Sequence, residues 1–210
     1  PAVHDGRRSK RPHSGRNGRE DHHRRILIMS EITQVRISGF GGQGVVLAGV
    51  LLGEAGVLDG KQTAGSNSYG AQARGSGCKS EIVFSEGLID FPHLTLVDIL
   101  IAMSQGAYDV NWKDVNGRSG LILYDRSLIT PREGIEVKQV GLPCTEFALK
   151  KLKNKQVANL ILLGALVEIT KIVSSKAIRK AIALHVSEKF QSLNLKALRI
   201  GMGLGRQIHG

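Results

Sequence analysis

The chain has 210 residues, of which 41% are hydrophobic and 4% aromatic, and its formal net charge is +11 at pH 7. This length and composition fit one soluble, well-packed domain, and no apolar run reaches the roughly 20 residues that would span a bilayer. The two cysteines, Cys78 and Cys144, lie far apart, and neither belongs to a Cys-x-x-Cys pair. We therefore expect buried thiols in a reducing, cytoplasmic compartment, and neither an iron–sulfur cluster nor structural zinc on this chain alone.

The basic character is partly a property of the first 28 residues. They hold eight Lys and Arg against three Asp and Glu, so they contribute 8 − 3 = +5 and leave +6 for the rest. We expect residues 1–28 to be a disordered basic extension ahead of Met29, and residues 29–210 to form a single domain. A nucleic-acid-binding arm is the alternative interpretation, but no aromatic residues alternate with the basic ones as a base-stacking surface requires.

The first folded stretch joins a buried strand, predicted over 34–38, to an apolar helix, predicted from Gly42 to about Gly56. Gly39, Gly41 and Gly44 between them have the spacing G-x-G-x-x-G. Glycine admits backbone angles closed to other residues, and the helix behind offers free N–H groups to an anion. The motif predicts either a phosphate-binding turn or a tight strand-to-helix turn without a ligand.

A second strand is predicted over 61–66, and its end argues against a nicotinamide cofactor. A dinucleotide-binding fold has Asp or Glu there to hold the ribose, whereas this chain has small and polar residues up to Asn67. Residues 66–78 then read as a polar, glycine-rich loop that contains Tyr69 and Arg74. Loops of this length in a compact domain are often functional, and the arginine fork suits a carboxylate or phosphate.

The remaining pattern alternates strands and helices and then becomes helical. Strands are predicted over 79–84, 97–103, 121–124 and 135–140, and a short helix capped by Ser104 extends to Tyr108. Three helices follow, from Thr145 to about Lys153, over 155–169, and from a Ser175 cap through Phe190, with a short, weak helix at the C-terminus. The order predicts an α/β fold: three layers, α/β/α, with a mostly parallel sheet and a helical C-terminal part.

Three ordered motifs resemble one family, the gamma subunits of the 2-oxoacid:ferredoxin oxidoreductases. They are 37–44 with the glycine turn, 68–75 around Tyr69 and Arg74, and 98–105 with the Ala-Tyr-Asp that follows at 107–109. Ala71 and Gln72 depart from the Pro-Glu usual in the second motif. The similarity extends from about Met29 to the C-terminus, and the Ser-Tyr-Gly form of the loop is more like 2-oxoglutarate members than pyruvate members.

The resemblance implies a complex that decarboxylates a 2-oxoacid, makes an acyl-CoA and passes electrons to ferredoxin. It implies thiamine diphosphate and magnesium on alpha and beta subunits, and iron–sulfur clusters on beta or a ferredoxin-like delta subunit. It places this chain near coenzyme A, with no nucleic-acid or membrane partner. We expect these residues to hold coenzyme A or to face the catalytic subunit: Gly39, Phe40, Gly41, Gly42, Gln43, Gly44, Tyr69 and Arg74.

No residue has the pattern of a complete catalytic site. His93 has no evident partner, and His185 lies beside the apolar face of a helix, which favours a structural role. Asp125 ends a strand where ligand clefts form, although capping of a turn accounts for it equally well. A free-standing nucleotide-binding protein and a basic interaction protein remain as alternative functions.

Overall fold

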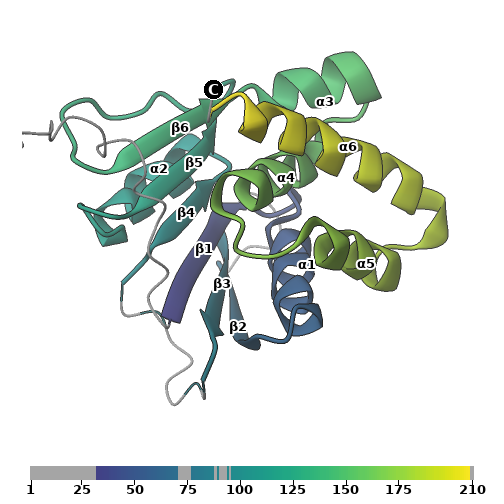
Figure 1. Ribbon diagram of the computed structural model, residues 1–210. Coiled ribbons are helices and arrows are strands. Elements are labelled where there is room, and N and C mark those ends of the chain that lie inside the picture. The colour runs from purple at the N-terminus through teal and green to yellow at the C-terminus, as the bar shows by residue number, and fades with distance from the viewer. Residues whose placement is uncertain (1–31, 71–76, 88, 90–93, 95, 209–210) are drawn as a thin grey trace, which may run out of the picture.

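Residues 32–70, 77–87, 89, 94 and 96–208 are described by a computed structural model (Figure 1). They form a six-stranded sheet with helices on both faces. The strands are β1 (Ile32–Phe40), β2 (Gln62–Tyr69), β3 (Gly77–Ser85), β4 (Ile99–Ala102), β5 (Leu121–Asp125) and β6 (Lys138–Leu142). Residues 1–28, Arg74 and His93 lie outside the described residues, so the expectations that concern them remain predictions.

The strands lie in the order β2-β3-β1-β4-β5-β6. The pairs β1–β4, β4–β5 and β5–β6 are parallel, whereas β3 runs antiparallel to both β1 and β2. Every strand except β3 therefore points the same way, and the predicted mostly parallel sheet is confirmed. The strands buried on both faces, β4 and β5, are continuous apolar runs, as parallel strands between two helical layers require.

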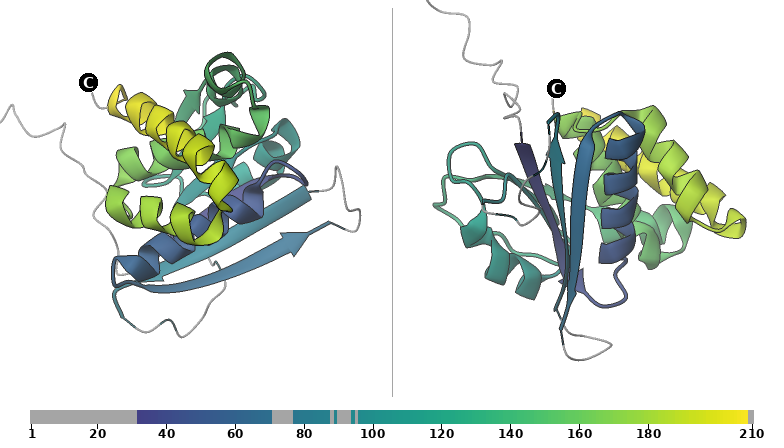
Figure 2. Two further views of the ribbon diagram at one scale, coloured as in Figure 1. Left: turned by 90° about the vertical axis from the view of Figure 1, so that its right-hand side faces the viewer. Right: turned by 90° about the horizontal axis from the view of Figure 1, so that it is seen from below.

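The two faces of the sheet are covered unequally, as Figure 2 shows in the view from below. One face carries α1 (Val45–Leu58) and α4 (Ala158–Thr170), with α5 (Ser175–His185) and α6 (Glu188–Arg206) packed outside them. The other carries α2 (Gln105–Asn111) and the 3-10 turn η1 (Trp112–Asp114). The remaining helical segments are α3 (Cys144–Leu152) and η2 (Lys155–Val157). Each face has its own apolar core, the larger under α1 and α4, the smaller around Tyr108 and Tyr124.

The predicted loop over 66–78 is wrong at both ends. Residues up to Tyr69 continue β2, and Gly77 and Cys78 already belong to β3, so the two strands form one long hairpin. The full length of this strand was not predicted, because its residues are mostly small and polar, whereas most strands are enriched in β-branched residues. The last strand is also displaced, since β6 begins at Lys138 rather than Ile135.

Several helix boundaries differ from the prediction, because a glycine can end a helix or lie inside it, and because either of two adjacent serines can be the N-cap. Gly56 does not end α1; it is buried, and an added Cβ would fall within 3 Å of the Phe84 ring. Ser174, not Ser175, caps α5, and its Oγ accepts from the Ala177 amide at 3.0 Å. The chain bends at Val186, so Phe190 belongs to the next helix. That helix, α6, has 19 residues and is not the short, weak helix expected.

Among the described residues, no helix is long and apolar enough to cross a bilayer.

Candidate functional site

The glycine motif forms the turn from β1 into α1. Gly39 and Phe40 end β1, and Gly42 and Gly44 have φ angles of +92° and +75°, a region that side chains strongly disfavour. Gly44 occupies the N-cap position of α1, and its carbonyl accepts from the Ala48 amide at 3.0 Å. The predicted strand–turn–helix geometry is confirmed, and α1 aims its positive end at this turn.

Gln43 closes part of the turn from within. Its Oε1 accepts from the Phe40 amide at 2.6 Å, and its Nε2 donates to the Met103 carbonyl at 2.8 Å, beyond the end of β4. The Gln43 amide itself donates to the Phe40 carbonyl at 3.1 Å. The amides of Phe40 and Gln43 therefore form hydrogen bonds within the protein and are not available to a ligand.

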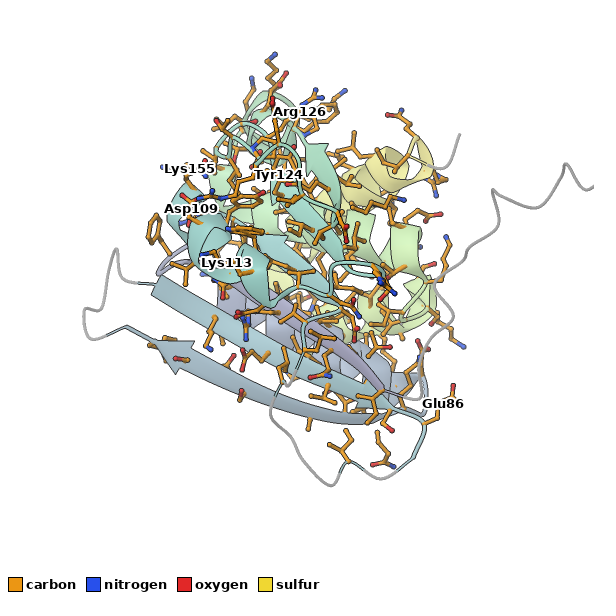
Figure 3. The ribbon with its side chains drawn as sticks, turned by 90° about the vertical axis from the view of Figure 1, so that its left-hand side faces the viewer. Glu86, Asp109, Lys113, Tyr124, Arg126 and Lys155 are labelled. Atoms are coloured by element: carbon orange, nitrogen blue, oxygen red, sulfur yellow. The ribbon has the colours of Figure 1, made fainter. Side chains whose placement is uncertain are left out.

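The amides of Gly41 and Gly42 have no hydrogen-bond partner among the described residues. Both glycines line a cleft of about 370 Å³, together with Gln43, Met103, Asp125, Thr145, Lys155 and Gln156. The cleft lies beyond the carboxyl ends of the parallel strands, where α/β sheets usually bind ligands. Figure 3 shows Tyr124, Arg126 and Lys155 toward the same end of the molecule, and Glu86, just after β3, toward the other. An anion in this cleft would meet free main-chain N–H groups and an ammonium group.

Asp125 has a capping role, one of its two predicted alternatives. Its Oδ1 accepts from the Ser127 amide at 3.0 Å, and its Oδ2 accepts from the Thr145 amide at 2.7 Å. The helix predicted to start at Thr145 has Pro143 as its N-cap, and Asp125 supplies the side-chain acceptor from a neighbouring strand. This carboxylate also raises the pKa of the buried Cys144 thiol further, beyond the rise that burial causes.

Asn159 is a supporting residue that sequence reasoning missed. It is buried on α4, and its Nδ2 donates to the Gly44 carbonyl at 3.1 Å. An added Cβ on Gly44 would overlap this amide group. A side chain at position 44 is therefore disfavoured both by the positive φ angle and by overlap with Asn159. The sequence signal for Asn159 was a polar residue in the mainly apolar run from Ala158 to Val167.

Of the remaining predicted residues, Gly39, Phe40 and Tyr69 line a second cleft, of about 560 Å³, on the hairpin side of the turn, and Arg74 lies outside the described residues. Gly39 pairs with Cys78, and Cys78 pairs with Tyr69, so the three residues form one row across β1, β3 and β2. Tyr69 is 67% exposed and lies two strands, roughly 10 Å, from Gly39. Phe40 and Tyr69 line this cleft, and they do not reach the cleft that holds Gly41 and Gly42.

Arg36 forms the polar floor of the second cleft. Its Nη2 lies 2.7 Å from Glu81 Oε1, its Nη1 pairs with Asp114, and Nη1 also donates to Asn111 Oδ1 at 3.1 Å. The two carboxylates neutralise the buried guanidinium, and Asn111 accepts a further hydrogen bond from it, so it is not free to bind a ligand. A charged residue between the two buried apolar residues Val35 and Ile37 was the signal that could have revealed it.

The other candidates have structural roles. His185 Nε2 lies 3.2 Å from Glu54 Oε2 and joins α5 to α1, in agreement with the predicted structural role. Cys78 and Cys144 are buried free thiols, as predicted, and burial raises the pKa of each. Within the described part of the chain, no group of three or more His, Cys, Asp or Glu side chains is placed to hold a metal ion.

The topology separates this turn from the dinucleotide-binding arrangement. In that fold the second strand lies beside the first, whereas here the antiparallel β3 lies between β1 and β2. The end of β2, where that fold carries the acidic residue that binds the ribose, therefore lies one strand further from the glycine turn than in the dinucleotide-binding fold.

Comparison with known families decides between the remaining interpretations. The family model described as pyruvate ferredoxin/flavodoxin oxidoreductase matches residues 34–204. The chain belongs to this family. The resemblance recognised from the three sequence motifs is thereby confirmed.

One relative matches over nearly its whole length. The 2-oxoglutarate synthase subunit KorC of Methanocaldococcus jannaschii is 40% identical over 188 residues, which cover 88% of this chain and 98% of the relative. The ketoisovalerate oxidoreductase subunit VorA of Methanothermobacter thermautotrophicus is 31% identical, over 83% of this chain and 36% of that longer chain. The pyruvate synthase subunit PorC of Thermotoga maritima is 26% identical, over 83% of this chain and 95% of that one.

Two solved structures have the same fold. The gamma subunit of a keto/oxoacid ferredoxin oxidoreductase from Geobacter sulfurreducens has a TM-score of 0.73 and 36% identity, over 83% of this chain and 99% of that one. A 2-oxoglutarate:ferredoxin oxidoreductase from Magnetococcus marinus, solved with 2-oxoglutarate, coenzyme A and succinyl-CoA, has a TM-score of 0.77. Its 20% identity is evidence for the fold alone, and the match covers 85% of this chain and 32% of that larger chain.

Proposed function

We propose that this chain is the gamma subunit of a 2-oxoglutarate:ferredoxin oxidoreductase. The observation that carries the proposal is the end-to-end match: the chain covers 98% of a 2-oxoglutarate synthase subunit and 99% of a solved gamma subunit. The complex oxidatively decarboxylates 2-oxoglutarate, joins the acyl group to coenzyme A, and passes the electrons to ferredoxin. The order of identities, 40% against 31% and 26%, favours 2-oxoglutarate over branched 2-oxoacids and pyruvate.

The catalytic cofactors belong on partner subunits in this proposal. Thiamine diphosphate, magnesium and the iron–sulfur clusters are assigned to alpha and beta subunits and a ferredoxin-like delta subunit. The two cysteines of this chain agree with this division, because both are buried single thiols with raised pKa values. Such thiols make poor cluster ligands, since ligation requires several thiolates that converge on one point.

We assign the coenzyme A contact of this chain to the cleft beside the glycine turn. Coenzyme A carries a diphosphate and a phosphomonoester, and free amides beside an ammonium group are chemically suited to such anions. Gly41, Gly42 and Lys155 would bind the phosphates, while Gly39, Gln43 and Gly44 shape the turn. Tyr69, Phe40 and Arg74 are assigned to the surface toward the catalytic subunit, because the first two line the other cleft.

Reconstitution of the complex tests the function. The full chain is co-expressed with alpha, beta and delta subunits from the same organism, and reduction of ferredoxin is measured with 2-oxoglutarate, pyruvate and 2-oxoisovalerate. We expect co-purification, and a coenzyme A-dependent rate with 2-oxoglutarate at least tenfold above the others. A complex that is equally active without this chain would refute the subunit assignment, and a preference for pyruvate would refute the substrate.

The coenzyme A contact is tested in the assembled complex. We expect Lys155→Ala to raise the apparent KM for coenzyme A on the order of tenfold, the loss of one charge-assisted hydrogen bond, with the KM for 2-oxoglutarate unchanged. Arg74→Ala tests the second loop in the same assay. Lys113→Ala, on η1, is the matched control and should change neither constant. An unchanged KM for coenzyme A in Lys155→Ala would place the ligand elsewhere.

A further inference from the structure

Helix α1 is apolar on every side, yet one side of it is uncovered. Glu54 is its only charged residue and is turned toward His185 on α5. Val46, Val50, Gly53 and Val57, spaced by four, three and four residues, form one stripe along the helix. Val50 is 38% and Val57 55% exposed, although a helix that is apolar all round is normally buried.

The stripe borders the free edge of the sheet. An added Cβ on Gly53 would lie 3.6 Å from the Thr63 methyl group, so this part of α1 lies over β2. The view from below in Figure 2 looks onto this edge, with β2 and α1 side by side and nearest the viewer. The uncovered helix side and the uncovered strand edge therefore form one continuous surface.

Within the described part of the chain, strand β2 lacks the sequence features that normally protect an edge strand. It has eight residues, no charged side chain and no proline, and it pairs with β3 in an unbroken register from Gln62 to Tyr69. The Gly70 amide donates to the Gly77 carbonyl, so the backbone groups of Gly70 face β3. Because backbone N–H and C=O groups alternate in direction along an antiparallel strand, those of every second residue before Gly70, starting with Tyr69, face outward, away from β3. These outward residues are Thr63, Gly65, Asn67 and Tyr69.

We propose that a second copy of this chain pairs with β2, antiparallel about a two-fold axis at Ser66, and joins the two sheets into one. In this register Thr63 lies opposite Tyr69 of the second copy, and Gly65 lies opposite Asn67. All four outward residues then form hydrogen-bonded pairs, and Thr–Tyr is a favourable β-branched–aromatic pair. No charge on β2 meets a like charge on its copy, as symmetry would otherwise force.

The helices meet at a normal packing distance in the same arrangement. Helix α1 packs over both β2 and β3, so the two symmetry-related helices are separated by about two strand spacings, roughly 10 Å. Helices in contact have axes 8–10 Å apart. Gly49 packs against Ser80, which pairs with Asn67, so Val50 lies near the level of the axis. One two-fold operation thus covers both the strand edge and the apolar stripe, which is why a second copy fits better than an unrelated chain.

A cysteine placed on the axis tests the register. Residues facing each other at a non-hydrogen-bonded position have Cα atoms about 4.5 Å apart, within the range of a disulfide. We expect Ser66→Cys in the full chain to form a reducible dimer of two identical chains on mild oxidation. Ser68→Cys is the matched control and should not cross-link, because Ala64 would face it. No cross-link at Ser66, or a Ser66 cross-link to a different subunit in the complex, would overturn the proposal.

Measurement of the molar mass tests whether the dimer forms without the introduction of a cysteine. The full chain should elute at twice its 22.7 kDa mass by light scattering, and the complex should contain two copies. Val50→Lys, which places two like charges near the axis, should halve the mass of the isolated chain. Val110→Lys, at a 75% exposed site on α2, should leave the dimer intact. A full chain at 22.7 kDa before substitution, with one copy per complex, would refute the pairing whatever the complex oxidises.

Discussion

Asn159 shows how far the glycine turn depends on a residue outside the motif. Its side chain bonds the carbonyl of Gly44 and fills the space where a Cβ would stand. The turn is thereby held from two sides, since Gln43 joins the ends of β1 and β4 across it. The free amides of Gly41 and Gly42 are consequently presented by a fixed frame and not by a flexible loop.

Two alanine substitutions in this turn separate backbone strain from steric overlap. Gly42→Ala meets no atom within 4 Å, so it should cost only the left-handed backbone penalty, about 1–2 kcal/mol of unfolding free energy. Gly44→Ala has the same penalty and also overlaps Asn159, which adds about 1–3 kcal/mol. Urea unfolding of both variants measures the difference. Equal losses would show that Asn159 moves aside freely.

Asp98 should make stability depend on pH. Burial raises the pKa of its carboxyl, although the hydrogen bond from the Gln34 amide, at 2.8 Å, opposes the rise. The folded chain therefore binds this proton more tightly than the unfolded chain, and stability falls as pH rises through the folded pKa. We expect Asp98→Asn to be more stable than the parent at pH 7, with the gain vanishing below about pH 4.

Thermal unfolding across pH 3.5–7 measures the Asp98 effect, with the exposed Glu86→Gln as the control. A loss of stability in Asp98→Asn at pH 7 would contradict it, and would mean that the ionised carboxylate is needed for the bond to Gln34.

At the scale of elements, glycines in helices determine how closely α4 and α6 approach. An added Cβ on Gly201 would overlap the Ile161 carbonyl, and one on Gly164 would overlap the Leu198 carbonyl. The two helices pack backbone to backbone there. The sequence suggested a weak terminal helix because glycine lowers helix propensity, but close packing outweighs that cost.

Neighbouring glycines of α6 provide a matched test of this packing. Gly201→Ala should lower the free energy of unfolding by about 1–3 kcal/mol or more, because the overlap is with backbone that cannot rotate away. Gly203→Ala, with nothing within 4 Å of the new methyl group, should raise it by about 0.5–1 kcal/mol. Chemical denaturation compares them, and similar effects at both positions would argue against the close contact.

At the scale of the whole molecule, the layers and the mostly parallel sheet followed from the sequence, whereas the strand order and the antiparallel direction of β3 did not. Alternating strand and helix patterns predict an α/β sheet, and apolar runs such as 99–102 mark its centre. Nothing in the periodicity of β2 and β3 showed that they form a hairpin, or that β3 inserts beside β1. For the same reason the motif placed Tyr69 near the turn, but not in a separate cleft.

Removal of residues 1–28 should leave the complex and its activity intact. The family match begins at residue 34, and the segment supplies +5 of the +11 net charge. To test this prediction, complex assembly and ferredoxin reduction are compared between the truncated and full chains at low and high salt. Loss of a salt-sensitive nucleic-acid interaction on truncation would support the alternative of a basic interaction protein.

The insertion of β3 beside β1 also has a consequence for synthesis on the ribosome. Val35 pairs with Ile82 on one side and with Ile99 on the other, so its second neighbour emerges 64 residues later (99 − 35). At about 5–20 residues per second, the first strand, with its buried Val35 and Ile37, waits roughly 3–13 s for that partner. The nascent chain must shield β1 during this interval, which makes the growing polypeptide a natural client for a ribosome-associated chaperone.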